Sequence, residues 1–141
     1  MEKSKTNLSV IRRFYDAYNN KDEKIMDDVI TDDYVDHGHQ PPGRGIEGAK
    51  SDQREFTAAF QDARFDIDEM IAADDRVVVR WTVHATHTGP FAGLPPTKKK
   101  ITVPGISLYR LRDGKITETR NQADLLGMFK QLGAIEKLKA A

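Results

Sequence analysis

The sequence predicts an α+β fold in which N-terminal helices cover a curved, mainly antiparallel sheet. Apolar residues recur at helical spacing through about the first 60 residues, and the period then changes to the two-residue alternation of strands. An Asp-Gly pair joins two alternating runs near the C-terminus, which is typical of a β-hairpin. Because helices come first and strands follow as a group, the order is not that of repeated βαβ units.

Length and composition indicate one domain over residues 1–141, with flexible ends at 1–6 and 136–141. A chain of 141 residues can bury a core without metals or disulfides. Its 22 basic and 22 acidic residues balance, so the chain has no general attraction to nucleic acid or anionic lipid. It has no cysteine, which excludes disulfides, thiol nucleophiles and thiolate metal sites.

No stretch of the sequence resembles a secretory h-region or approaches the roughly 18 apolar residues of a membrane span. The run Lys98-Lys99-Lys100 is too short to form a polyanion-binding patch. We therefore expect a cytoplasmic protein without nucleic-acid or membrane partners.

Three helices are expected in the N-terminal half. Apolar spacing predicts an amphipathic helix over 7–19, and Asp22 is placed to cap a short second helix. Prolines and glycines predict that 31–45 is irregular, and a third helix is expected over 46–60.

The later elements are strands and one closing helix. Alternation predicts strands, in order, at 65–71, 76–88, 101–112 and 115–123. A Pro/Gly-rich loop separates the second from the third. The closing helix follows from Leu125, and Gly133 is placed to end it.

Three stretches carry a resemblance to a known family. The sequence THTGPFAGLPPT is followed by a strand ending YRLRDGKITE and then by the helix D-LLGMFKQLG. The earlier motifs FYDAYNNKD, VDHG and GIEGAK occur in the same order as in that family. Over roughly residues 8–135 the chain resembles the SnoaL-like polyketide cyclase (ester cyclase) family of the NTF2-like superfamily.

The resemblance implies an NTF2-like cone with an apolar pocket, usually dimeric, that binds a small apolar ligand. Cyclases of this type close a ring by intramolecular aldol condensation without a metal or organic cofactor, so we expect no cofactor. Their acid/base is an Asp after the last strand, which Asp124 matches. A second polar residue lies one strand away, and Arg110 is the nearest match. The family's common Trp near the end of the last strand is absent, with Arg120 in its neighbourhood.

Strand alternation extends the prediction around Asp124. If its carboxylate faces inward, Arg120 and Gln122 share that face. A carboxylate in an apolar cavity has a raised pKa and can take a proton from an activated carbon. Nearby Arg80 or Arg110 would oppose that shift or stabilise an enolate oxygen. The alternatives are that this charged face meets solvent, and that Asp124 caps the closing helix.

Histidines offer further polar candidates. His37, beside an Asp, is a candidate acid/base partner or an ordinary loop histidine. His84 and His87 lie on opposite faces of one strand, so at most one of them lines a given cavity. No HxxxH or HExxH spacing indicates a metal site, and we expect none.

Aromatic residues are candidates for the walls of the pocket. Tyr15, Tyr18 and Tyr34 can offer phenols to a substrate carbonyl, and Phe56 and Phe60 can pack against a ring-shaped ligand. The alternative is that these side chains form ordinary core.

The leading hypothesis is a cofactor-free enzyme in which Asp124 is the acid/base and Arg110, Arg80 or His37 stabilises developing charge. Two alternatives stay open at this point. One is lyase, isomerase or epoxide hydrolase chemistry in the same pocket. The other is a non-catalytic ligand-binding or dimerisation module.

Overall fold

The structure, a computed structural model, describes residues 2–135. In chain order its elements are α1 (Glu2–Asn19), the 3-10 helix η1 (Glu23–Ile25), α2 (Met26–Val29), β1 (Ile30–Asp36), β2 (Gly43–Arg44), α3 (Gly45–Ala59), β3 (Arg64–Ala73), β4 (Arg76–Thr86), β5 (Lys100–Arg112), β6 (Lys115–Ala123) and α4 (Leu125–Gln131). None of the helices in this described part is long and apolar enough to cross a membrane.

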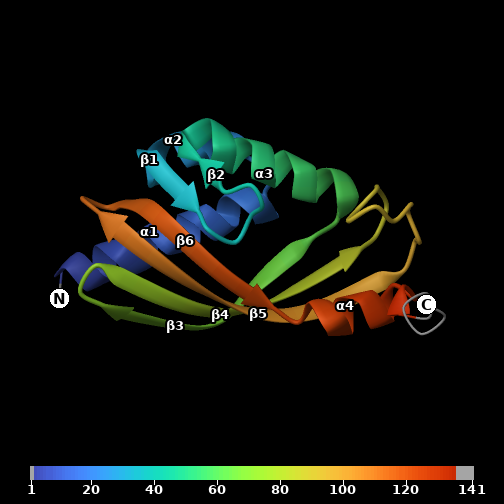
Figure 1. Cartoon of the computed structure of the whole chain (residues 1–141). Coiled ribbons are helices and arrows are strands. Elements are labelled where there is room, and N and C mark those ends of the chain that lie inside the picture. The colour runs from blue at the N-terminus through green and yellow to red at the C-terminus, as the bar shows by residue number, and fades with distance from the viewer. Residues whose placement is uncertain (1, 136–141) are drawn as a thin grey trace.

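The strands form one curved sheet in the order β2-β1-β6-β5-β4-β3, and the N-terminal helices cover its concave side (Figure 1). Neighbouring strands are antiparallel except for β1 and β6, which are parallel. The predicted α+β cone with a mainly antiparallel sheet is therefore confirmed.

Alternation along the long strands assigns the two faces of the sheet. On β4 and β5 the odd-numbered residues are buried and most even-numbered ones are exposed or half-exposed. Residues directly opposite each other on paired strands share a face, and the register pairs Ser107 with Asn121 and Tyr109 with Thr119. The odd-numbered residues of β6 from Thr119 onwards therefore also face the interior.

Two local predictions need correction. The segment expected to be irregular contains β1, whose alternation is masked by the run Thr31-Asp32-Asp33. The first helix begins at Glu2, whereas its predicted start was residue 7. The end predicted at 136–141 lies outside the described residues.

The loop between β4 and β5 is tied to the end of α3. The amides of Thr88 and Gly89 both donate to the Ala59 carbonyl, at 2.9 and 3.1 Å. A Cβ on Gly89 would lie 2.0 Å from the Ala58 carbonyl oxygen, so only glycine allows this approach. The attachment holds Phe91 against the ring of Phe60, with centroids 5.2 Å apart.

Candidate active site

A cavity of about 810 Å³ lies between the concave face of the sheet and the helices. Its volume is in the range of sites for drug-sized ligands. Its wall is largely apolar and includes aromatic side chains from helices, strands and the β4–β5 loop: Phe14, Tyr15, Tyr18, Tyr34, Phe56, Phe65, Trp81, Phe91 and Tyr109. A flat, largely apolar molecule fits such a wall.

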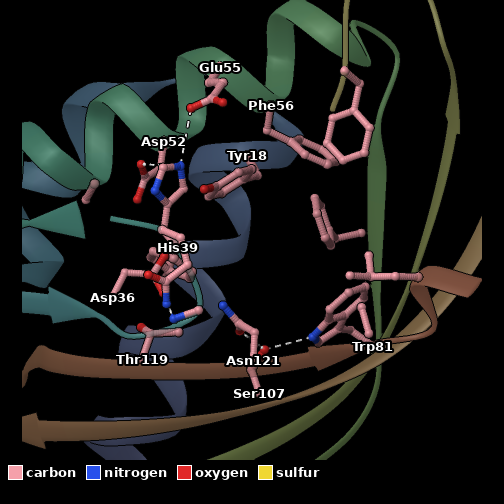
Figure 2. Close-up of a pocket in the computed structure, with 18 of the residues that line it drawn as sticks. Tyr18, Asp36, His39, Asp52, Glu55, Phe56, Trp81, Ser107, Thr119 and Asn121 are labelled. Atoms are coloured by element: carbon pink, nitrogen blue, oxygen red, sulfur yellow. Dashed lines mark hydrogen bonds and ion pairs between the residues drawn. The ribbon is translucent and has the colours of Figure 1, made fainter. Parts of the chain in front are cut away.

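Acidic and basic side chains gather at one end of this cavity (Figure 2). His39 Nε2 lies 3.4 Å from Asp52 Oδ1 and 3.3 Å from Glu55 Oε2. His39 Nδ1 lies 2.8 Å from the carbonyl oxygen of Pro41. Because a carbonyl can only accept, Nδ1 carries the proton of that bond, and Nε2 is the nitrogen that faces the two carboxylates.

The acidic end is assembled from two neighbouring segments. Asp52 and Glu55 are three residues apart on α3 and therefore share a helix face. Asp36 ends β1, and its Oδ1 accepts from the amide of Gly38 at 2.8 Å, which turns the chain towards His39.

Burial shifts the acid–base properties of this group. Burial raises the pKa of Asp52 to about 6; the nearby His39 opposes that shift, whereas the carboxylates of Asp36 and Glu55 add to it. Burial likewise raises the pKa of Asp36. The hydrogen bond to Pro41 and the two carboxylates raise the pKa of His39. The end of the cavity therefore holds a carboxyl group whose pKa, at about 6, is above its ordinary value of 3.8.

A second polar group crosses the floor of the cavity. Trp81 Nε1 donates to Ser107 Oγ at 2.9 Å, and Ser107 Oγ donates to Asn121 Oδ1. Figure 2 shows the Asn121 nitrogen directed into the cavity. The indole reaches Ser107 across Gly105, where a Cβ would lie 2.2 Å from Trp81 Cζ2.

The tyrosines contribute phenols that stay protonated. Tyr15 and Tyr109 share a hydrogen bond of 2.8 Å, and Tyr34 donates to Thr119 at 2.8 Å. Burial raises the pKa of Tyr15, Tyr18 and Tyr34 and brings that of Tyr109 to about 12. Figure 2 shows the Tyr18 hydroxyl turned towards the acidic end.

Four residues predicted to bind substrate do line the cavity: Tyr15, Tyr18, Tyr34 and Phe56. Two others are buried beside it without lining it. The rings of Phe60 and His87 pack with centroids 5.5 Å apart, and His87 Nδ1 contacts Thr97 at the base of the β4–β5 loop. The opposite placement of His87 inside and His84 outside agrees with the predicted alternation.

The remaining predicted wall residues point away from the cavity. They are even-numbered residues on the outer face of the sheet, and their predicted pocket positions were wrong: Arg80, His84, Arg110, Arg120 and Gln122. The error arose because the wrong one of the two alternating sets of residues was taken to face inward. On β6 the inward set contains Thr119 and Asn121 and is itself polar, so polarity did not distinguish the two faces.

Asp124 lies at the N-terminus of α4, where its Oδ1 accepts from the Gly127 amide at 2.9 Å. It is exposed and does not line the cavity, so the pocket position predicted for it was wrong and the capping alternative describes it. His37 also lies outside the lining, in the turn after β1, with Nε2 3.9 Å from Glu118 Oε1.

Sequence reasoning missed the residues of the acidic end and the floor. They are Asp36, His39, Asp52, Glu55, Ser107 and Asn121. One signal was available: the hairpin register, started from the apolar odd-numbered set of β4, places Asn121 inside. The contact between His39 and α3 has no comparable signal, because it depends on how the turn packs.

His39, Asp52 and Glu55 are also the group in residues 2–135 that could hold a metal ion, with donor atoms within 4.8 Å of one another. One imidazole and two carboxylates suit a divalent transition metal. A protonated His39 satisfies the same two carboxylates without a metal, because its Nε2–H can donate to either of them.

The fold and the site together define an α+β cone protein with an acid–base group at one end of an aromatic cavity. The family model described as SnoaL-like polyketide cyclase matches residues 9–132. The chain belongs to the SnoaL-like polyketide cyclase family.

Curated relatives include the aklanonic acid methyl ester cyclase DnrD of Streptomyces peucetius, 29% identical over 132 residues and 91% of each chain. The aklanonic acid methyl ester cyclase AcmA of Streptomyces galilaeus is 28% identical, over 89% of this chain and 90% of the relative. Among solved structures, TsrD from Streptomyces laurentii has a TM-score of 0.86 and 27% identity, covering 92% of this chain and 96% of that one.

Proposed function

We propose that this protein is a cofactor-free cyclase that closes a ring in a small, largely apolar compound bearing two carbonyl groups. Family membership and the names of the curated relatives support ring closure as the reaction class. The observation that carries the proposal is Asp52, a carboxyl whose pKa is raised to about 6 at the end of an aromatic cavity.

Asp52 would act as the base of an intramolecular aldol reaction. Its carboxylate takes a proton from the carbon next to one carbonyl, and the electron pair of the broken C–H bond moves onto that carbonyl oxygen as an enolate. The enolate carbon then attacks the second carbonyl carbon, forming a C–C bond and an alkoxide. The alkoxide takes a proton back from Asp52, or from His39 with the Asp52 proton then passing to His39, so atoms and charge balance without a co-reactant.

His39 supports this role through its position. A protonated imidazole between Asp52 and Glu55 keeps both carboxylates oriented and can return a proton to an oxygen. Tyr18, with a phenol that stays protonated, can donate to a developing negative oxygen at the same end.

Incubation with aklanonic acid methyl ester, the compound named for the relatives, tests the proposal. The expected product has the same mass and one more ring, and chromatography with mass spectrometry detects it. Formation by the wild type and loss in Asp52→Asn support the proposal. Binding of the ester without conversion, under conditions in which a relative converts it, supports a ligand-binding module instead.

We also propose that two copies associate through the outer face of the sheet. Four large apolar side chains are exposed there: Ile71 on β3, Val78 on β4, and Ile106 and Leu108 on β5. Arginines and carboxylates alternate around them, including Arg80 close to Glu69 and Arg110 close to Glu118. A face carrying both charges can match its own copy across a two-fold axis.

A further inference from the structure

We infer that Asn121 binds the carbonyl oxygen of the reacting ligand and stabilises it as an enolate, and that Trp81 and Ser107 set the direction of its amide. The inference deepens the proposed function and rests on it for the identity of the acceptor. It assigns a role to side chains on the floor of the cavity, which meets the acidic end at Gly38.

The direction of the hydrogen bonds follows from the chemistry of each group. An indole N–H can only donate, so Trp81 occupies a lone pair of the Ser107 hydroxyl. The Ser107 hydroxyl donates to Asn121 Oδ1, so the amide presents its oxygen to Ser107. The amide nitrogen of Asn121 is therefore turned away from Ser107.

The freed amide nitrogen faces the cavity. Among residues 2–135, Asn121 Nδ2 has no hydrogen-bond acceptor, and Asn121 lines the cavity wall. A donor on the wall of this cavity can bind an acceptor oxygen on a ligand. A preorganised N–H at a developing negative charge is the arrangement that stabilises an enolate.

Gly38 brings this donor close to the acidic end. A Cβ on Gly38 would lie 2.8 Å from Asn121 Nδ2 and 3.2 Å from Asp36 Oδ1. The amide and the carboxylates thus approach the same ligand volume from two sides. The carboxylates would take the proton from the ligand carbon, and the Asn121 amide would donate to the oxygen that becomes negative.

The first experiment measures ionisation of a bound dye, 2-hydroxyanthraquinone, whose anion absorbs at longer wavelength than its neutral form. The bound dye is titrated in the wild type, in Asn121→Leu and in Arg120→Ala. Arg120 precedes Asn121 on the same strand but lies on the outer face. We expect the apparent pKa of the bound dye to rise in Asn121→Leu by about 1 unit, a tenfold effect, and to be unchanged in Arg120→Ala.

A structural role alone would give a different result. If Asn121→Leu weakened binding of neutral and anionic dye equally, or if the wild type bound no dye, the inference would be overturned. Ser107→Ala, which releases the amide oxygen, should raise the dye pKa by less than Asn121→Leu does. An equal pKa in Ser107→Ala and the wild type would remove the orienting role of Ser107 and Trp81.

Turnover of aklanonic acid methyl ester separates this inference from the proposed function. If the wild type converts the ester, we expect Asn121→Leu to lower kcat about 100-fold with a smaller change in KM. Unchanged kcat in Asn121→Leu beside an inactive Asp52→Asn would refute the inference and keep the cyclase. A shifted dye pKa with no conversion by the wild type would refute the cyclase and keep the Asn121 donor.

Discussion

Both faces of the sheet carry polar side chains, many on the outer face and few on the inner one, and the two sets differ in their surroundings. On the outer face, Arg80 and Arg110 form exposed ion pairs with Glu69 and Glu118, and such pairs contribute little to stability. On the inner face, Ser107 and Asn121 lie among aromatic rings and are linked to the Trp81 indole by hydrogen bonds.

This difference shows that residue type alone does not mark the site. The arginines of the outer face are stronger charges than any amide, yet solvent screens them. A neutral donor in the cavity acts on a ligand with far less competition from water. Matched substitutions in the cavity and on the outer face therefore test whether enclosed polar groups matter more for turnover than exposed ones.

The largest effect is expected from Asp52→Asn. Removing the base should lower turnover of aklanonic acid methyl ester by about 10²- to 10⁴-fold. Glu69→Gln, a matched loss of a carboxylate on the outer face, should leave turnover unchanged. Steady-state rates of both variants, with folding checked by circular dichroism, make the measurement. Equal losses of turnover in the two variants would contradict a special role for the carboxylate in the cavity.

The pH dependence follows from the same carboxyl. Asp52 must be ionised to accept a proton, so wild-type kcat/KM should rise with pH through about 6 and then level off. The pKa of Asp52 is about 6 in the folded state and 3.8 ordinarily. Between these two pH values the folded state therefore holds a proton that the unfolded state has lost. Asp52 therefore contributes less to stability as pH rises through that window. A flat rate profile across it would argue against Asp52 as the base.

Gly105→Ala should disturb the inner face through packing. The new Cβ would lie 2.2 Å from Trp81 Cζ2, so the indole must move off Ser107. We expect a cost of about 1–3 kcal/mol in the free energy of unfolding, as for other overpacked cores, and an altered Trp81 emission spectrum. Trp81 is the single tryptophan, so the signal has one source. An unchanged spectrum and stability would contradict the close contact.

The outer face should respond through association. Ile106→Asp places a charge in the exposed apolar cluster, and we expect it to shift the protein from dimer to monomer in size-exclusion chromatography with light scattering. The ionisation of bound 2-hydroxyanthraquinone should stay as in the wild type. A wild type that is monomeric at micromolar concentration would refute the proposed dimer.

The smallest effect is expected from Asp124→Ala. Loss of its bond to the Gly127 amide should cost about 1 kcal/mol of stability, with turnover unchanged. Thermal or urea unfolding and a rate assay measure the two quantities. Loss of turnover in a folded Asp124→Ala would return this residue to the mechanism.

Helical and strand periods predicted most of the fold because they record burial along each element. The β4 alternation and the Asp-Gly hairpin appear in the structure as predicted. The strand β1 escaped prediction because its neighbouring aspartates, Asp32 and Asp33, hide the alternation.

The site was harder to predict because alternation gives two faces without saying which is inside. Assuming that Asp124 faced inward selected the wrong set on β6, whereas the apolar Val77 and Val79 of β4 select the right one through the register. The pairing of His39 with Asp52 could not be obtained from spacing. It depends on a turn that packs against a helix.

The two halves of the site come from separate stretches of chain. Residues 36–55 supply the acidic end, whereas residues 81–121 supply Trp81, Ser107 and Asn121 on the floor. The boundary between them is the exposed turn at Gln61 and Asp62, which follows α3. A single crossover there between two related genes would exchange reactive groups while keeping the floor of the cavity. Natural recombination at this turn thus offers one route by which reactivity and ligand preference diverge independently.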